Sequence, residues 1–274
     1  VYGQTLSLTI GGVSFQAAQF AITATILLLA VMLGEGHKYI PWLKHYMVRF
    51  LLGGMIFGGP FLLVVKQGDL GSAMVLVPIV AAMLLVGNIP FRCLIAVALI
   101  GLTVLPPVYF FALKDYQRAR IQVTIDLLMN RPVDVKGDGY SLTNLLKAVG
   151  SAGLEGKGLH IKDLPEGQKS MLQLGLTSKA TAHTDFIFSS AAETFGFRGG
   201  AIMILGFIFI LTMSFMIAFF SRDQLGRLIT VGIIALLFAH IFEHIGMNIG
   251  ITPITGIPLP LISYGGTFVL MIMF

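Results

Sequence analysis

The chain alternates between long apolar runs and shorter polar connections. A helix needs about 20 apolar residues to cross a bilayer. Four runs in the first half come near that length: Phe15–Leu33, Val48–Val65, Leu70–Val86 and Cys93–Leu113. Two more, Gly200–Phe220 and Leu228–Gly250, follow in the second half, and a further run begins at Phe268. The pattern predicts an all-α protein with several membrane-spanning helices.

A long polar segment, Lys114–Arg198, separates the fourth run from the fifth. It is too charged to lie exposed in hydrocarbon. Apolar positions at helical spacing predict short helices within it, at Tyr116–Met129, Leu142–Val149 and Pro165–Leu176. Its glycine-rich stretch Gly150–Gly158 is predicted to be a flexible turn. A loop of this length inside a membrane domain is usually functional.

These patterns divide the chain into three parts. We expect transmembrane helices in 1–113, a large loop in 114–198 and transmembrane helices in 199–274. The segment Ile251–Pro260 is rich in Pro and Gly, so we expect it to be non-helical. Irregular backbone at membrane depth is tolerated only around a cavity or inside the protein.

Composition agrees with a membrane location. The chain is 56% hydrophobic and only 11% charged, which is too apolar for a soluble globular domain. The net charge of +5 is explained by membrane orientation and anionic membrane lipids, so no nucleic-acid partner is expected. The basic residues of alternate short connections mark the cytoplasmic side: Lys38, Lys44, Arg49, Arg92, Arg222 and Arg227. The loop 114–198 then faces the opposite side.

Asp185 is the first candidate for chemistry. It is followed directly by Phe186, Ile187 and Phe188, at the place where the loop returns to the membrane. A carboxylate here is either solvated at the membrane surface or held in a partly buried pocket. A pocket would raise its proton affinity, which suits a general base. Spacing alone leaves both readings open.

Five blocks of sequence carry a family resemblance. They are KQGDLGSA at Lys66–Ala73, LKDYQRARI at Leu113–Ile121, the GY…KAVGSAGLEGKGL run at Gly139–Leu159, HTDFIFSSAAETFGFRG at His183–Gly199 and IGMNIGITPITGIPLPLISYGG at Ile245–Gly266. In these blocks the chain resembles the SEDS family (RodA, FtsW, SpoVE), whose members polymerise the lipid-linked peptidoglycan precursor lipid II. The GMNIG and TGIPLP sequences are most similar to the RodA branch.

The resemblance implies a fold and a location. The SEDS fold has ten transmembrane helices, with a large extracytoplasmic loop between the seventh and the eighth. By that count the first span here is the fourth, about seven helices are represented, and the tenth is truncated. The resemblance also implies a multi-pass protein of the bacterial cytoplasmic (inner) membrane. No resident cofactor is expected, and a divalent cation (Mg²⁺ or Mn²⁺) is left open.

The resemblance further implies a peptidoglycan glycosyltransferase that serves cell elongation and rod shape. The family's catalytic aspartate matches Asp185, which would activate the 4-OH of the acceptor sugar. That oxygen attacks the anomeric carbon of the donor, and undecaprenyl pyrophosphate leaves. The leaving pyrophosphate needs cations. Candidates from the loop are Lys114, Arg118, Arg120 and Lys147, which could instead pair with lipid headgroups or with acids.

Two further acids have alternative roles. Asp69 either caps the third span or lines the cavity, and Glu193 either pairs with a loop cation or acts as a second carboxylate at the site. His240 and His244 have metal-ligand spacing but no evident third ligand, so no metal site is expected.

The chain departs from the family pattern in places. Gln16, Gln19 and Ile22 stand where the family has QPSE-x-x-K, Ser7 stands near its tryptophan, and His240 and His244 replace Gln and Asn. Two alternatives to the enzyme therefore stay open. One is a lipid II flippase or transporter, and the other is a non-catalytic scaffold for a class B penicillin-binding protein. The enzyme itself is expected to work with such a transpeptidase, on lipid II and undecaprenyl-linked glycan.

Overall fold

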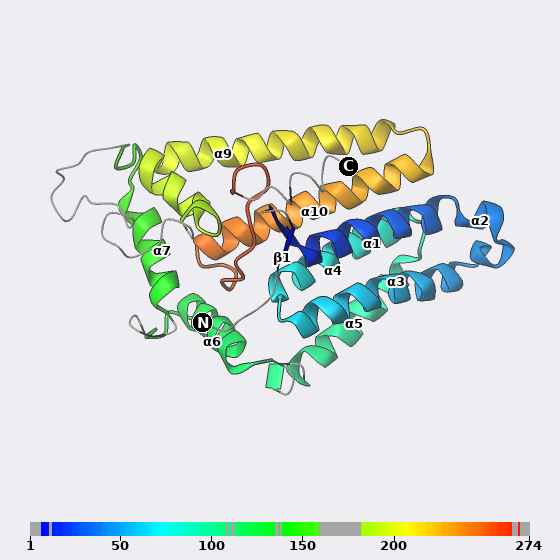
Figure 1. The fold of residues 1–274 in the computed structure, drawn as a ribbon, viewed down its shortest axis with the longest axis horizontal. Coiled ribbons are helices and arrows are strands. Elements are labelled where there is room, and N and C mark those ends of the chain that lie inside the picture. The colour runs from blue at the N-terminus through cyan, green and yellow to red at the C-terminus, as the bar shows by residue number, and fades with distance from the viewer. Residues whose placement is uncertain are drawn as a thin grey trace. The chain divides into compact units, whose positions relative to one another are not determined.

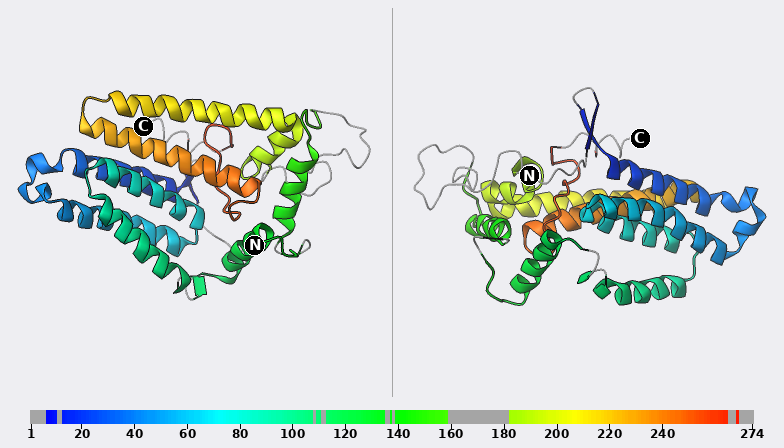
Figure 2. Two further views of the ribbon diagram at one scale, coloured as in Figure 1. Left: turned by 180° about the vertical axis from the view of Figure 1, so that it is seen from behind. Right: turned by 60° about the horizontal axis from the view of Figure 1, so that its bottom comes forward.

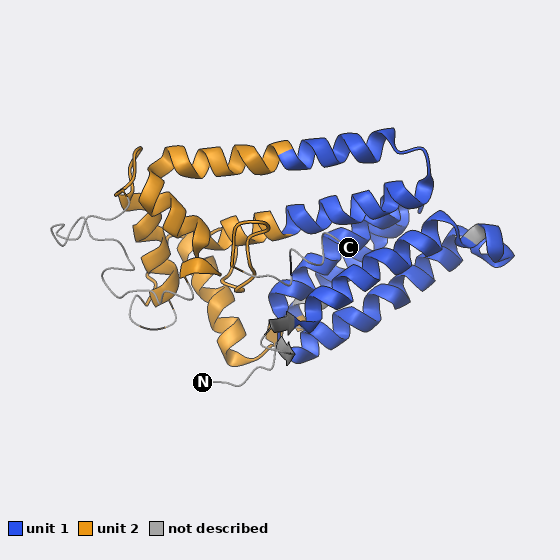
Figure 3. Ribbon diagram, turned by 45° about the horizontal axis from the view of Figure 1, so that its top comes forward, with its two compact units in different colours: residues 1–106, 210–239, 266–274 blue, residues 107–209, 240–265 orange. Residues whose placement is uncertain are grey.

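The computed structural model describes residues 7–10, 13–107, 109–110, 113–134, 137, 139–158, 182–264 and 268. The helix predicted at Pro165–Leu176 and nearly all of the apolar run that begins at Phe268 lie outside these residues. The chain forms two compact units (Figure 3). Unit 1 comprises Val1–Pro106, Ile210–Ala239 and Gly266–Phe274, and unit 2 comprises Pro107–Phe209 and His240–Gly265.

Helices dominate the described residues (Figure 1). The first part of the chain forms α1 (Ala17–Gly34), α2 (Gly36–Tyr39), the 3-10 turn η1 (Pro41–Lys44), α3 (Tyr46–Gln67), α4 (Leu70–Val86) and α5 (Phe91–Pro107). The second part forms α6 (Asp115–Leu128), α7 (Tyr140–Ser151), α9 (Ile187–Phe220) and α10 (Gln224–Asn248). Helices α1, α3, α9 and α10 are long and apolar enough to cross a membrane, and α4 and Phe91–Thr103 are shorter apolar helices. This confirms the predicted helical membrane fold.

The core of unit 1 is built where α1, α3 and α4 pack side by side (Figure 1). Four α1 residues at helical spacing are buried: Ile22, Ile26, Leu29 and Leu33. They are matched on α4 by Leu76, Ile79 and Met83, each fully buried. A Cβ on Gly53 of α3 would lie 3.0 Å from Leu84 and 3.6 Å from Leu29, so the small residue lets the helices approach closely.

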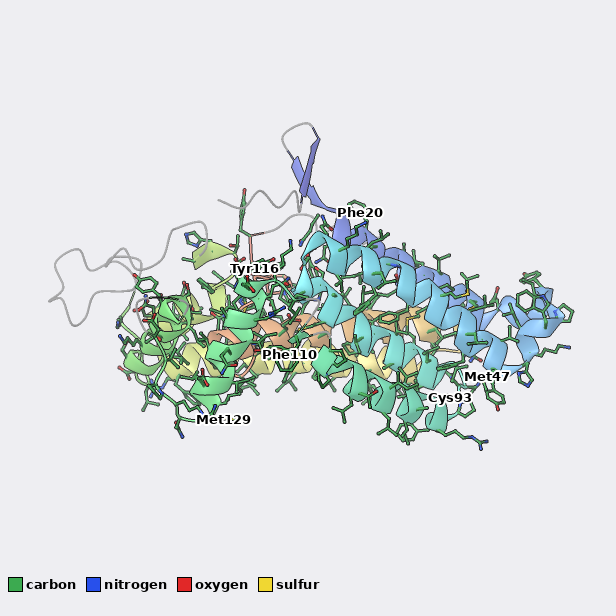
Figure 4. All side chains as sticks on the ribbon, turned by 90° about the horizontal axis from the view of Figure 1, so that it is seen from below. Phe20, Met47, Cys93, Phe110, Tyr116 and Met129 are labelled. Carbon is green, nitrogen blue, oxygen red and sulfur yellow. The ribbon has the colours of Figure 1, made fainter. Side chains whose placement is uncertain are left out.

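Large apolar side chains also cover the outside of the helices. Figure 4 labels examples on several elements, of which Phe20, Met47, Phe110 and Met129 are between 41% and 63% exposed. A soluble protein rarely exposes so many large apolar groups together. Lipid contact explains this surface.

A short β-hairpin precedes α1, which the apolar pattern did not predict (Figure 2). Strand β1 (Ser7–Ile10) pairs antiparallel with β2 (Val13–Gln16), and the register places Ile10 opposite Val13. The first span therefore begins at Ala17, two residues later than expected. Alternating apolar and polar residues around Gly11–Gly12 favour a tight hairpin, and this period-2 signal is separate from the helical one.

Two other helix ends differ from the prediction. Helix α5 ends at Pro107 rather than at Leu113. Adjacent prolines at 106 and 107 have no N–H to donate to the preceding turn, which weakens the end of the helix. Helix α9 begins at Ile187 rather than at Gly200, and it contains a non-helical residue, Gly196, at φ 68° and ψ −166°. Asp185 therefore lies in a turn that leads directly into a helix, rather than in a free loop.

Candidate active site

Asp185 lies in a turn directly before α9, within unit 2. Its side chain is half-buried, and a Cβ on Gly256 would lie only 3.3 Å from Asp185 Oδ2. The carboxylate is therefore packed against the backbone of the chain that follows α10. Gly256 also has a φ of 78°, a conformation that residues with a side chain rarely adopt. Both the backbone conformation and the close approach of Asp185 therefore favour glycine at this position.

Burial raises the pKa of Asp185 above 3.8, its ordinary value. A hydrogen bond from the Thr184 side chain and the positive charge of Arg120 act in the opposite direction, and burial is the larger effect. Desolvation disfavours the charged form of a carboxyl group, whereas a nearby cation favours it. Asp185 is thus a stronger proton acceptor than a solvated aspartate.

Asn248, the last residue of α10, holds the backbone around Asp185. Its Nδ2 donates to the carbonyl of Asp185 (3.3 Å) and to that of His244 (2.8 Å), and its Oδ1 accepts from Ser189 N (3.3 Å). Asn248 is fully buried. Ser189 lies in the first turn of α9, whose N–H groups have no partner inside the helix. One side chain therefore caps α9 and anchors the residue that precedes it.

We expect Asn248→Ala to destabilise the protein by about 1–3 kcal/mol, because a buried N–H and buried carbonyls would lose their partner. Thermal unfolding of the full-length protein in detergent measures the effect. Gln122→Ala, which removes an exposed amide from α6, is the matched control and should change stability by less than about 0.5 kcal/mol. Equal melting temperatures for the two variants would contradict this role of Asn248.

The chain after α10 turns back to the start of α9 (Figure 1). Helix α10 ends at Asn248 and is followed by Gly250 at φ 79°. Ile251 N then donates to Gly246 O at 2.8 Å, as in a Schellman motif. Ser263 Oγ then donates to Thr184 O (2.7 Å), and Tyr264 N donates to His183 O (3.1 Å). Residues 251–259 form no helix, as predicted, and Gly256, Ser263 and Tyr264 of the following chain contact residues 183–185.

His244 holds the middle of this returning segment. Its Nδ1 lies 2.8 Å from the carbonyl of Ile257, so the ring donates to the backbone there. His240 and His244 are both fully buried, and no group of three or more His, Cys, Asp or Glu able to hold a metal occurs in the described part of the chain. His244, one of the two histidines that depart from the family pattern, therefore has a structural contact.

Of the four predicted cations, the structure brings Arg120 to Asp185. Arg120 donates to the carbonyl of Ile254 (2.9 Å), beside Gly256, and its charge acts on the carboxylate. Arg118 instead donates to Phe110 O (2.8 Å) and lies 3.9 Å from Asp115. The remaining two, Lys114 at the start of α6 and Lys147 on α7, are exposed.

The two other predicted acids have partners. Glu193 forms an ion pair with Lys157 at 2.8 Å, which confirms the pairing with a loop cation. Asp69 caps α4 in unit 1, as predicted: its Oδ1 accepts from Ser72 N (3.0 Å) and its Oδ2 from Ser72 Oγ (2.8 Å). Gln16, at the end of the hairpin, donates to the same carboxylate (3.3 Å). A direct role of these acids toward substrate stays a prediction.

Comparison with known proteins decides the family. The model of the FtsW/RodA/SpoVE family of cell cycle proteins matches residues 4–274. The chain belongs to this family. That confirms the resemblance found in the sequence blocks.

Two relatives in this family are 33% identical to the chain over nearly all of its length. Peptidoglycan glycosyltransferase MrdB of Escherichia coli K12 is 33% identical over 268 residues, which cover 97% of this chain and 67% of MrdB. Stage V sporulation protein E of Bacillus subtilis 168 is 33% identical over 265 residues, which cover 96% of this chain and 67% of that protein. The chain thus spans about two thirds of the length of these relatives.

Solved structures of similar fold agree. A chain from a structure titled as the coordination of polymerization and crosslinking by a peptidoglycan synthase complex matches with a TM-score of 0.72 and 23% identity, over 99% of this chain and 70% of that one. The rod shape determining protein RodA of Thermus thermophilus matches with a TM-score of 0.59 and 24% identity, over 99% and 66%. At these identities the match establishes the FtsW/RodA/SpoVE fold.

Three partners around the candidate site were not foreseen from the sequence: Asp185 for Asn248, Ile257 for His244, and Lys157 as the cation that pairs with Glu193. Asn248 lies in the GMNIG block and Lys157 in the GLEGKG stretch, so the signal was present as a motif without an assigned role. Their partners are between 13 and 63 residues away in the chain, and helical periodicity carries no information about contacts at those separations.

Proposed function

We propose that this protein is a peptidoglycan glycosyltransferase of the RodA type, which polymerises lipid II into glycan strands, with Asp185 as the general base. Relatives that include MrdB of Escherichia coli are named as peptidoglycan glycosyltransferases. The observation that carries the assignment of Asp185 is its setting. The carboxylate is half-buried just outside a membrane-spanning helix, its backbone is held by Asn248, and a cation acts on it.

The reaction follows from this geometry. A sugar hydroxyl is a poor nucleophile until a positioned base accepts its proton, and burial gives Asp185 the proton affinity to do so. The acceptor 4-OH loses its proton to Asp185 as its oxygen bonds to the anomeric carbon of the donor. The bond from that carbon to undecaprenyl pyrophosphate breaks, and the leaving oxygen takes the electron pair. Arg120 is the cation best placed to stabilise the developing phosphate charge.

We also propose the location and the partner. The protein lies in the bacterial cytoplasmic membrane, with transmembrane helices in 1–113 and 199–274 and with the loop 114–198 on the outer side, as the distribution of basic residues favours. A class B penicillin-binding protein would cross-link the strands. Support comes from the similar fold of a chain in a peptidoglycan synthase complex. Lys114, Arg118 and Lys147 are proposed as weaker contacts to substrate or lipid headgroups.

An assay on labelled lipid II distinguishes this function from its alternatives. The full-length protein with its transpeptidase partner, reconstituted in liposomes, should convert lipid II into long glycan strands. Movement of lipid II across the bilayer without strand formation would contradict the proposal and favour a transporter. Restoration of cell shape by a variant that forms no strands would favour a scaffold.

The pH dependence of polymerisation should show whether the charge of Arg120 lowers the pKa of Asp185. A general base works deprotonated, so activity should fall at low pH with a midpoint above 3.8, because burial raises the pKa of Asp185. Arg120→Gln removes a charge that lowers this pKa, so the midpoint should move to higher pH. The rate at neutral pH should fall about 10²–10³-fold as phosphate stabilisation is lost.

Arg131→Gln is the matched control for Arg120. Arg131 is also an exposed arginine near the α6 helix, and its partner is Asp126 at 3.6 Å. Its substitution should leave the rate and the midpoint unchanged. A midpoint that moves to lower pH in Arg120→Gln would show that Arg120 does not act on the base.

A further inference from the structure

The glycine-rich stretch 153–158 crosses α9 at its non-helical residue. A Cβ on Gly156 would meet the backbone of Thr194 and Gly196, and a Cβ on Gly196 would meet the backbone of Gly156 and Leu154. Neither glycine could be replaced without displacing backbone. Four hydrogen bonds join the two segments: Lys157 N to Glu193 O (2.8 Å), Gly158 N to Thr194 O (3.0 Å), Phe197 N to Gly153 O (2.9 Å) and Arg198 N to Leu154 O (3.2 Å). The stretch predicted to be flexible is thus held against α9.

Two ion pairs join the same segments, and they differ in burial. Lys157 Nζ lies 2.8 Å from Glu193 Oε1, and their side chains are only 15% and 5% exposed. Arg198 Nη1 lies 3.2 Å from Glu155 Oε1, with side chains 68% and 78% exposed. An exposed pair contributes little, whereas removal of one partner of a buried pair leaves an uncompensated charge. Only the buried pair should constrain the crossing strongly.

The crossing matters because Gly196 separates the first turns of α9 from the rest of the helix. Residues 187–195 form a short helical segment before the break at Gly196. Because the helix is interrupted there, the direction of this segment is not fixed by the rest of α9. Asn248 holds the beginning of this segment, next to Asp185, and the crossing with 153–158 holds its end. A change at either end would turn the segment and move the carboxylate.

We propose that Lys157 and Glu193 are positioning residues: their buried ion pair fixes the direction of helical segment 187–195 and so places the Asp185 carboxylate for reaction. This inference rests on the proposed glycosyltransferase function. Neither residue has to touch substrate. Lys157 acts through Glu193, and Glu193 acts through helical segment 187–195, which directly follows the turn that carries Asp185.

Kinetics of lipid II polymerisation by the full-length protein with its partner test the inference. Lys157→Met and Glu193→Gln should each lower kcat about 100-fold, since a displacement of about 1 Å at a catalytic group has that effect. The KM for lipid II should stay unchanged. Low-pH activity should also change, because a carboxylate that turns toward solvent loses the burial that raises its pKa, and the midpoint would move to lower pH.

Paired variants provide the rescue and the control. The charge-swapped variant Lys157→Glu/Glu193→Lys restores an ion pair. Its kcat should be at least about tenfold higher than that of either single variant, which corresponds to about 1.4 kcal/mol in activation free energy. Arg198→Gln breaks the exposed pair between the same two segments and should keep the wild-type kcat. Folded single variants with wild-type kcat, or a loss of kcat shared by Arg198→Gln, would overturn the inference.

If the single variants fail to fold, the double variant Lys157→Met/Glu193→Leu tests the inference, because it removes both charges of the buried ion pair together. A lowered kcat with unchanged KM supports the inference, and a wild-type kcat overturns it. Failure of the underlying function looks different. In that case the wild-type protein forms no strands, or Asp185→Asn forms them at the wild-type rate.

Discussion

Asp185→Asn should lower the rate of lipid II polymerisation about 10³-fold, within the 10²–10⁴-fold range that a general base contributes. An amide has nearly the same shape as a carboxylate but does not accept the proton of the attacking hydroxyl. The variant should still fold, because the hydrogen bond from Asn248 goes to the backbone carbonyl of residue 185 and not to its side chain. The loss should therefore appear in kcat.

Asp115→Asn is the matched control for this substitution. Asp115 also lies at the end of a helix in unit 2, but its side chain is fully exposed and is 3.9 Å from Arg118. A solvated carboxylate with one distant partner contributes little to stability. Polymerisation by Asp115→Asn should match the wild type, and comparable losses in both variants would indicate a general effect of charge.

Gly196→Ala should destabilise the protein by about 3 kcal/mol or more, the largest structural effect that we expect of a single methyl group here. At φ 68° and ψ −166° the residue occupies a region of backbone conformation that is essentially restricted to glycine. An added Cβ would also collide with the backbone of Gly156 and Leu154, which cannot rotate away as a side chain can. Thermal unfolding in detergent, followed by helical circular dichroism, measures the loss.

Gly206→Ala tests the same change elsewhere on α9. A Cβ at Gly206 meets nothing within 4 Å, and the residue has ordinary helical conformation. Alanine is favoured over glycine by about 1 kcal/mol inside a helix, so this variant should be as stable as the wild type or more stable. A Gly196→Ala variant with an unchanged melting temperature would show that the crossing with 153–158 is not formed.

The membrane-spanning elements could be predicted from sequence because burial and length leave a direct signal. Helix α4 matches its predicted range, Leu70–Val86, at both ends. Its ends are set locally, by the Asp69 cap at the beginning and by Gly87 after the last residue. Where local chemistry marks a boundary, the pattern of apolar residues is sufficient to find it.

The beginning of α9 could not be predicted in the same way. The polar residues of Ser189–Thr194 and the glycine at 196 resemble loop sequence. Residues 189–194 are nevertheless helical, because Asn248 caps the first turn and residues 153–158 hold the break at Gly196. Both contacts come from distant parts of the chain. The hairpin before α1 was missed for a different reason, since its strands are only four residues each.

The candidate site was predictable in part. The residues alone left Asp185 open between a base and a solvated acid, and the family resemblance supplied its role. Its raised pKa and the contacts of Arg120 and Asn248 depend on a chain that returns to the turn after more than 60 residues. Arg120 and Arg118 lie two residues apart on one helix, and only the structure shows that they have different partners.

The most direct test of Asp185 as the base measures binding and product formation on the same sample. Full-length Asp185→Asn, reconstituted with its partner, would be titrated with labelled lipid II and then assayed for glycan strands. We expect lipid II to bind with the wild-type Kd while strands fail to form, because the substitution removes a proton acceptor and leaves the surrounding contacts in place. Strand formation at the wild-type rate would contradict the assignment.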